Sequence, residues 1–219
     1  MIIYVYDQGE YITFAESLKR QPQGKRSIYV NLTNRCTCNC TFCLRSLKHM
    51  DESMTLWLKQ EPTVAEVQQE LAALPWQYIQ EVVFCGFGEP TCRLDDMKVL
   101  LAYIKQNHAG VTTRINTNGL SDLAYGRDTA PDFGKGLVDT ISISMNASNK
   151  ERYLELTRSQ FGLPSYDTML DFAQRCKQYV PQVVLTVVDH VEDSEEIKKC
   201  RAICQKRGLQ LRVRVYEDK

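Results

Sequence analysis

Strand-like and helix-like segments alternate along most of this chain of 219 residues. Six segments carry residue patterns typical of strands, at residues 27–33, 81–86, 112–117, 138–146, 183–189 and 210–216. Between them, apolar residues at helical spacing predict helices at residues 64–74, 95–106, 149–155, 165–179 and 194–206. Strands joined by helical crossovers pair in parallel, so this order predicts an α/β fold built on one parallel sheet.

One face of nearly every predicted strand is polar, whereas parallel strands buried on both faces are normally apolar throughout. The polar positions are Tyr29, Asn31, Thr33, Thr112, Arg114, Asn116, Asn118, Thr140, Ser142, Ser144, Asn146, Arg212, Arg214 and Tyr216. The alternate positions are apolar and should face the helices: Ile28, Val30, Leu32, Ile115, Ile141, Ile143, Met145, Leu211, Val213 and Val215. A sheet curled so that its polar faces converge would enclose a wet or ligand-filled lumen. An antiparallel sheet with one solvated face would show the same alternation, but the helical crossovers argue against it.

The first 27 residues precede this pattern and predict a small β extension. Residues 1–6 and 11–14 flank the turn signal Asp-Gln-Gly-Glu, which predicts a hairpin added at an edge of the sheet. No repeat and no linker separates a second domain in the rest of the chain. We therefore expect one structural domain, with an N-terminal extension at residues 1–27 and a core at residues 28–219.

Three cysteines, Cys36, Cys40 and Cys43, lie at C-x3-C-x2-C spacing directly after the first strand of the core. A 4Fe-4S cluster normally takes four thiolates, so a loop that offers three leaves one iron open to a small molecule. Structural zinc would usually need a second pair of Cys or His ligands, which does not follow. Cys38 breaks the spacing and is interpreted as a spare thiol. A second cluster is a weaker interpretation of Cys176, Cys200 and Cys204 than buried core cysteines.

A second motif, Gly-Phe-Gly-Glu-Pro-Thr at residues 86–91, follows a short apolar run. Small residues at the end of a strand let the backbone approach a ligand closely. The motif lies roughly one βα unit after the cysteines, which strengthens both signals.

Together these motifs resemble those of the radical S-adenosylmethionine (SAM) superfamily, and the resemblance implies a partial (β/α)6 TIM-type barrel. It also implies that the open iron binds SAM. An electron from the cluster then cleaves SAM to methionine and a 5'-deoxyadenosyl radical, which abstracts hydrogen from a substrate. A reductant such as flavodoxin or ferredoxin would supply that electron.

From Tyr29 onward, the chain resembles more specifically the TatD-linked radical SAM proteins. The motifs that carry this resemblance include Asn-Thr-Asn-Gly at residues 116–119, Gly-Arg-Asp at 126–128 and Ser-Met-Asn-Ala at 144–147. The family label records an association with a TatD-type metal-dependent hydrolase, and it implies no particular substrate.

The resemblance assigns roles within the expected lumen. Ser144 and Asn146 match residues that hydrogen-bond the SAM ribose, and Phe42 matches an aromatic residue near the adenine. Val187 is a further candidate for adenine contact, although a core valine is the simpler interpretation. The implied SAM-binding set is Phe42, Gly86, Phe87, Gly88, Glu89, Asn116, Asn118, Ser142, Ser144, Asn146 and Val187, where Phe87 replaces a glycine of the family pattern.

Five arginines lie at strand ends or on the polar face, namely Arg93, Arg114, Arg127, Arg212 and Arg214. Guanidinium groups bind carboxylate and phosphate well. One or more should hold the SAM carboxylate, and the others suit an anionic substrate. We expect Arg114 to meet Arg212 or Arg214 at such an anion, because the strands offer few acids to the lumen besides Glu89.

Three functions remain open. The first is an enzyme that abstracts hydrogen from a small anionic substrate. The second is an activating enzyme that installs a glycyl radical on a partner protein, and the third is a non-catalytic SAM-binding or redox-sensing protein. The intact motifs argue against the third, and a lid formed by residues 44–63 would favour a small substrate over a protein.

The net charge and the cysteine content limit the binding partners and the cellular location that we expect. The formal net charge is zero, so no bulk attraction to nucleic acid or anionic membranes is expected. Nine cysteines without a signal peptide or a long apolar run predict a reducing, cytoplasmic location.

Overall fold

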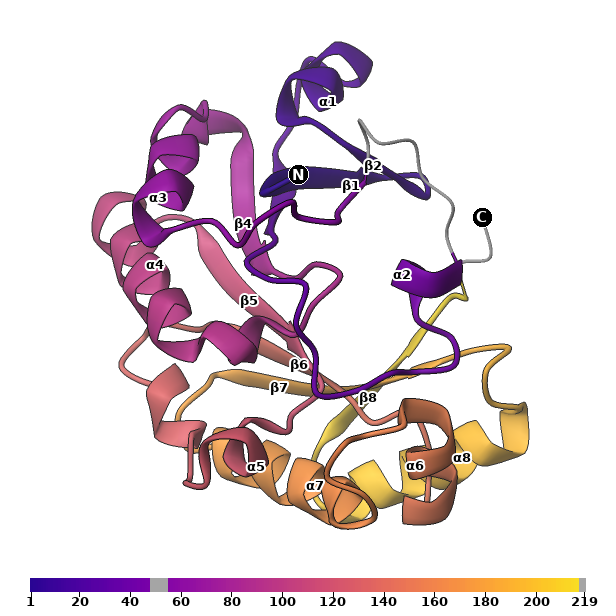
Figure 1. The fold of residues 1–219 in the computed structure, drawn as a ribbon. Coiled ribbons are helices and arrows are strands. Elements are labelled where there is room, and N and C mark those ends of the chain that lie inside the picture. Colours follow the sequence, from indigo (N-terminus) through magenta and orange to yellow (C-terminus); the bar gives the residue numbers. More distant parts are fainter. Residues whose placement is uncertain (48–54, 217–219) are drawn as a thin grey trace.

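The computed structural model describes residues 1–47 and 55–216, and it contains one eight-stranded sheet in the order β2-β1-β3-β4-β5-β6-β7-β8 (Figure 1). The parallel strands are β3 (Arg26–Val30), β4 (Ile79–Phe84), β5 (Thr112–Thr117), β6 (Thr140–Ser144), β7 (Gln182–Val188) and β8 (Gln210–Arg214). All six predicted strands are present, and each pairs with its neighbour in the chain. The predicted parallel α/β fold is confirmed.

Most of the helices lie on the outer side of the curved sheet (Figure 1). The α-helices after β3 are α2 (Leu44–Leu47), α3 (Val64–Ala72), α4 (Leu94–Asn107), α5 (Ser121–Tyr125), α6 (Lys150–Thr157), α7 (Pro164–Cys176) and α8 (Ser194–Lys206). Short 3-10 helices occupy η1 (Trp76–Tyr78), η2 (Pro90–Arg93) and η3 (Ala130–Phe133). The arc of strands is open between the N-terminal hairpin and β8, and α2 lies on that open side (Figure 1). The sheet is therefore a partial barrel.

The N-terminal hairpin consists of β1 (Ile3–Asp7) and β2 (Glu10–Ile12), and it confirms the predicted hairpin. β1 pairs antiparallel with β3, so the hairpin extends the edge of the parallel sheet. A short helix that we did not predict, α1 (Phe14–Arg20), follows it, and the side chain of Thr13 accepts a hydrogen bond from the backbone of Glu16 at its start. The domain boundary at residue 27 stays a prediction.

The helix-facing side of the sheet forms the core, as the strand pattern predicts. Ile28, Ile115, Ile141 and Ile143 have no solvent exposure. Val215 is an exception, since it follows the end of β8 and is 76% exposed. Within the described residues, no helix is long and apolar enough to cross a membrane.

Candidate active site

A cavity of about 420 Å³ lies at the carboxyl ends of the parallel strands. Its lining includes polar residues from four predicted strands: Tyr29, Arg114, Asn116, Asn118, Ser144, Asn146, Arg212, Arg214 and Tyr216. The predicted convergence of polar strand faces is therefore present. The volume falls in the range of small-molecule sites.

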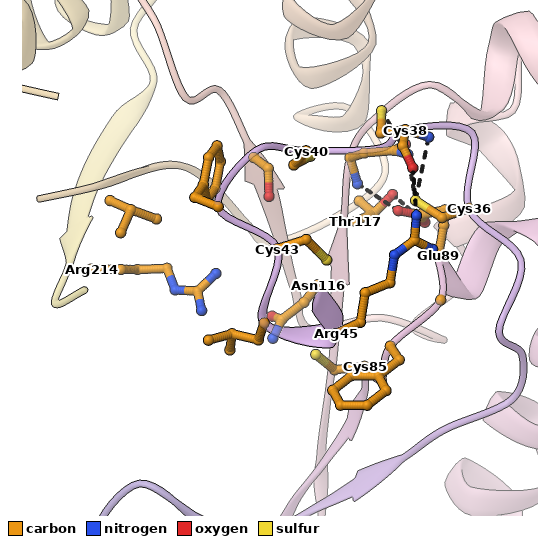
Figure 2. Close-up of a pocket in the computed structure, with 18 of the residues that line it drawn as sticks. Cys36, Cys38, Cys40, Cys43, Arg45, Cys85, Glu89, Asn116, Thr117 and Arg214 are labelled. Carbon is orange, nitrogen blue, oxygen red and sulfur yellow. Dashed lines mark hydrogen bonds between the residues drawn. The ribbon is translucent and has the colours of Figure 1, made fainter. Parts of the chain in front are cut away.

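The cysteine loop forms one side of this cavity, and Cys36, Cys40 and Cys43 all line it (Figure 2). The loop is anchored on the end of α6, where helix carbonyls lack partners within the helix. The backbone N–H of Asn39 donates to the carbonyl of Thr157 at 2.9 Å, and that of Thr41 donates to the carbonyl of Leu156 at 2.9 Å. Helix α6 thus holds the loop in place.

The donor set fits an iron-sulfur cluster. Each of the three thiols is partly exposed, whereas Cys38 is only 5% exposed. No group of three Cys, His, Asp or Glu residues in the described ranges could hold a single metal ion. Thiolates that bind a 4Fe-4S cluster each reach a different iron, so they need not converge on one point. Burial raises the pKa of the Cys43 thiol, while the neighbouring Arg45 opposes the rise.

The two glycines of residues 86–91 permit close packing against the segment that leads into the cysteine loop. A Cβ atom on Gly86 would overlap the side chain of Asn31, and one on Gly88 would overlap the backbone carbonyl of Thr33. The backbone N–H of Glu89 also donates to the carbonyl of Arg35 at 2.8 Å. Contact with the Asn31 side chain at Gly86 and with the backbone at Gly88 is therefore enough to favour glycine at both positions.

Glu89 connects this turn to the end of β5. Its buried carboxylate accepts hydrogen bonds from the hydroxyl of Thr117 and the backbone N–H of Asn118, both at 2.7 Å. It also accepts from the backbone and the hydroxyl of Thr91. Burial raises the pKa of Glu89, and the hydrogen bonds from these residues oppose the rise. Its carboxylate therefore fixes the geometry of the turn.

Phe87 lines the cavity and also packs against the N-terminal extension. Its ring makes edge contacts with Trp57 at 5.4 Å and with Tyr11 at 6.5 Å between centroids. With Tyr4, Tyr11 and Leu56 it forms a small buried apolar cluster. The residue that departs from the family pattern is thus part of the interface with the hairpin.

The predicted lid is described only in part. Residues 48–54, which include Lys48, His49 and Met50, lie outside the described residues. Of the remainder, Leu56 is 2% exposed, and its carbonyl accepts a hydrogen bond from the side chain of Asn31 at 2.6 Å.

Most of the predicted SAM-binding residues line the cavity, including Phe42, Ser144 and Asn146. Asn116 also lines it, and its buried side-chain oxygen has no partner among the described residues. That unpaired acceptor fits a site built for a polar ligand. The side-chain N–H of Asn118 instead approaches the cysteine loop, at 3.0 Å from the Thr37 hydroxyl and 4.0 Å from the Cys36 sulfur.

Two residues of the predicted set do not line the cavity. Ser142 is 5% exposed, and its hydroxyl accepts a hydrogen bond from Arg212 at 3.0 Å. Val187 is fully buried in the core, and Val188 lines the cavity in its place. Successive residues of a strand face opposite sides, so the assignment to Val187 was wrong by one position.

Three of the five predicted arginines line the cavity, and they differ in their partners. Arg114 pairs through two hydrogen bonds with Glu81, at 2.9 and 3.1 Å. Glu81 does not line the cavity, and Glu89 is the only acid among the described residues that do, as expected. Arg212 and Arg214 form no ion pair with a described residue, and Arg214 reaches toward the cavity from the side opposite the cysteines (Figure 2). Burial lowers the pKa of Arg212, and the charges of Arg114 and Arg214 lower it further.

Arg93 and Arg127 do not line the cavity, which corrects their assignment to substrate. Arg93 is mostly buried and pairs with Asp96 at 2.6 Å. Arg127 pairs with Asp132 at 2.7 Å on the surface. Both guanidinium groups already have protein carboxylates as partners.

Several cavity residues were not assigned to SAM or substrate from the sequence. Arg45, which belongs to the predicted lid of residues 44–63, lines the cavity and donates to the carbonyl of Cys38 at 3.2 Å. Tyr6 from the hairpin and Tyr153 from α6 also line the cavity, but nothing in their sequence surroundings separates them from core tyrosines.

Comparison with known proteins agrees with this site. Residues 30–202 match the family model described as the radical SAM superfamily. A GTP 3',8-cyclase of Corynebacterium glutamicum (strain R) is 29% identical over 197 residues, which cover 85% of this chain and 48% of that protein. The chain thus spans about half the length of this curated relative.

Solved structures share the fold. Streptococcus suis SuiB bound to SAM superposes with a TM-score of 0.66 at 17% identity, over 92% of this chain and 43% of SuiB. Methylornithine synthase (PylB) superposes with a TM-score of 0.57 at 13% identity, over 86% of this chain and 52% of that chain. The family model covers well over half of the sequence. The chain therefore belongs to the radical SAM superfamily, a family of enzymes that bind a 4Fe-4S cluster and SAM.

Proposed function

We propose that this protein cleaves SAM reductively and uses the resulting radical to abstract hydrogen from a small anionic substrate. One observation carries the proposal. A single cavity is lined by Cys36, Cys40 and Cys43 and also by Arg212 and Arg214, which form no ion pair with described residues. Arg214 reaches into it from the side opposite the cysteines (Figure 2).

The cofactor supplies the radical chemistry when it is bound. The protein's own residues hold and orient it. The three cysteines would bind the cluster, and Glu89 keeps the glycine turn beside them in a fixed conformation. The unpaired oxygen of Asn116 and the side chains of Ser144 and Asn146 would hydrogen-bond SAM, with Phe42 beside its adenine.

The arginines support an anionic ligand. Arg212 and Arg214 are exposed to solvent in the cavity. The charges of Arg114 and Arg214 lie near Arg212, so an anion in the cavity would stabilise all three groups. One arginine could bind the SAM carboxylate and leave the other for the substrate. The name of the curated relative, GTP 3',8-cyclase, indicates that a small polyanion is acted on within this family.

A partner protein is the second candidate substrate. One solved structure with this fold is SuiB bound to the precursor peptide SuiA, with a TM-score of 0.67. The cavity of about 420 Å³ favours a small molecule over a protein substrate. A protein substrate would be consistent with the glycyl-radical alternative.

Anaerobic reconstitution with iron and sulfide, followed by incubation with SAM and dithionite, tests the proposal. We expect 5'-deoxyadenosine release that increases when the substrate is found by screening anionic metabolites. Release that increases only with a partner protein would favour the activating enzyme. A bound cluster and bound SAM without any release would favour the non-catalytic alternative.

Three narrower proposals accompany this function. Flavodoxin or ferredoxin is the proposed reductant, and either should replace dithionite in the assay.

The resemblance to TatD-linked proteins suggests a functional link to a TatD-type hydrolase, which co-purification would test. All nine cysteines are free thiols, which supports a reducing, cytoplasmic compartment.

A further inference from the structure

Tyr153 carries a buried hydroxyl that has no hydrogen-bond partner among the described residues. The residue lies in α6 and has no solvent exposure. A buried hydroxyl without a partner destabilises the folded state by about 1–3 kcal/mol. A buried polar group without a partner calls for an explanation, and one such explanation is a ligand that pairs with it when bound.

The position of Tyr153 identifies that ligand. It lies three and four residues before Leu156 and Thr157, whose carbonyls anchor the cysteine loop, so all three residues share one face of α6. Tyr153 also lines the cavity together with Cys36, Cys38 and Cys40. Tyr153 therefore belongs to the same cavity lining as the cysteines that would bind the cluster.

Electrostatics agree with this placement. Burial raises the pKa of Tyr153 well above its usual value, and the nearby Cys38, Cys40, Glu89 and Cys36 raise it further. The hydroxyl therefore stays protonated beside these groups. Thiolates and sulfide accept hydrogen bonds and cannot donate them, so the tyrosine must be the donor.

We propose that the Tyr153 hydroxyl donates a hydrogen bond to a sulfur of the bound cluster, either a cysteine thiolate or an inorganic sulfide, and so raises the cluster's reduction potential. This inference rests on the cluster assignment made above. Hydrogen bonds to the sulfurs are one of the determinants of cluster potential, because they stabilise the more negative, reduced state. The side-chain N–H of Asn118, near the Cys36 sulfur, would add a second donor from the end of β5.

The substitution Tyr153→Phe removes the hydroxyl and keeps the ring. In reconstituted protein without SAM, a potentiometric titration followed by electron paramagnetic resonance should show a more negative midpoint. We expect reduction to become about tenfold less favourable, which is 59 mV for a one-electron couple. Iron content should not change, because the three cysteines remain.

Tyr166→Phe is the matched control. The Tyr166 hydroxyl is also buried without a partner among the described residues, and its ring lies 5.5 Å from that of Tyr153. Tyr166 does not line the cavity, so its substitution should leave the midpoint unchanged. An equal shift in both variants would overturn the proposal, as would no shift in Tyr153→Phe.

The apoprotein gives a readout that does not need the cluster. An unpartnered hydroxyl contributes nothing favourable to the fold, so apo Tyr153→Phe should unfold at the same temperature as the apo wild type or higher. A lower unfolding temperature would show that the Tyr153 hydroxyl has a hydrogen-bond partner within the protein, which would contradict the assignment. Loss of the cluster in this variant would mean that the hydroxyl helps to retain the cluster and does not only tune its potential, which would also contradict it. Failure of the wild type to bind iron would instead contradict the proposed function.

Discussion

The two sides of the cavity differ in how completely the protein pairs its own charged groups. On the cysteine side, the loop amides bond to α6 and Glu89 accepts four hydrogen bonds. On the arginine side, the side chain of Arg212 hydrogen-bonds only to Ser142, and the side chain of Arg214 has no partner among the described residues. The cofactor side is thus shaped by the fold itself, whereas the arginine side leaves charge for a ligand to neutralise.

If this comparison is right, the largest effects should come from the cysteines. Replacing Cys36, Cys40 or Cys43 by Ala should reduce iron from about four per chain to near zero, because each thiolate holds one iron of the cluster. The SAM-dependent change in the electron paramagnetic resonance signal and the release of 5'-deoxyadenosine should both disappear. Iron analysis and chromatography measure these outcomes.

Cys176→Ala serves as the control, since this thiol is buried in the core and does not line the cavity. It should keep the full iron content. Retention of a cluster in Cys36→Ala, and its loss when Cys38 is also replaced, would show that Cys38 can act as a ligand. An iron content of about eight per chain, twice that of one cluster, would support a second cluster at Cys200 and Cys204.

The next largest effect should follow from Glu89→Ala, which leaves several buried donors without an acceptor. We expect the free energy of unfolding to fall by about 3 kcal/mol, as measured by urea denaturation of the apoprotein. Glu195→Ala, which removes an acid that is 72% exposed on α8, should change it little. Equal stability of the two variants would mean that Glu89 does not organise the cysteine side.

A smaller effect is expected at the SAM site. Ser144→Ala should weaken SAM binding by about 1 kcal/mol, or roughly fivefold in Kd, through one lost hydrogen bond. Ser142→Ala should not affect SAM directly, because its hydroxyl bonds to Arg212 and the residue does not line the cavity. Calorimetry on the reconstituted protein distinguishes the two, and the reverse order of effects would refute our assignment of the ribose site.

The smallest effect on the fold should come from the arginine side. Arg214→Ala should change the free energy of unfolding by no more than about 0.5 kcal/mol, because the side chain is exposed and has no described ion pair. Iron content should also stay constant. A large loss of stability would show that Arg214 is structural, and the contrast between the two sides would fail.

The strands, and the position of the three cysteines beside the polar strand faces, could be predicted because both depend on local spacing. The polar-apolar alternation fixed which face of β5 and β6 points inward, and Asn116 and Ser144 lie there as expected. The partners of the arginines depend on contacts between strands, so the pairing of Arg114 with Glu81 could not be found from spacing alone.

Other features of the structure could not be predicted from the sequence, for different physical reasons. Helix α1 has only seven residues, too few for a clear helical periodicity. On β7, Val187 is buried in the core and Val188 lines the cavity; valines occur on both faces of this strand, so the periodicity did not separate them. Tyr153 looks like an ordinary core residue until its hydroxyl is seen to lack a partner.

Phe87 also bears on how this chain could have evolved. Its ring is buried because Tyr11 and Trp57 cover it, and Tyr11 belongs to the hairpin. An ancestor without the hairpin would have exposed that ring beside the cofactor, and a descendant that returned to glycine would leave a hole under the hairpin. The motif change and the extension are therefore expected to be gained or lost together, so that a phenylalanine at this position would mark relatives that carry a similar N-terminal hairpin.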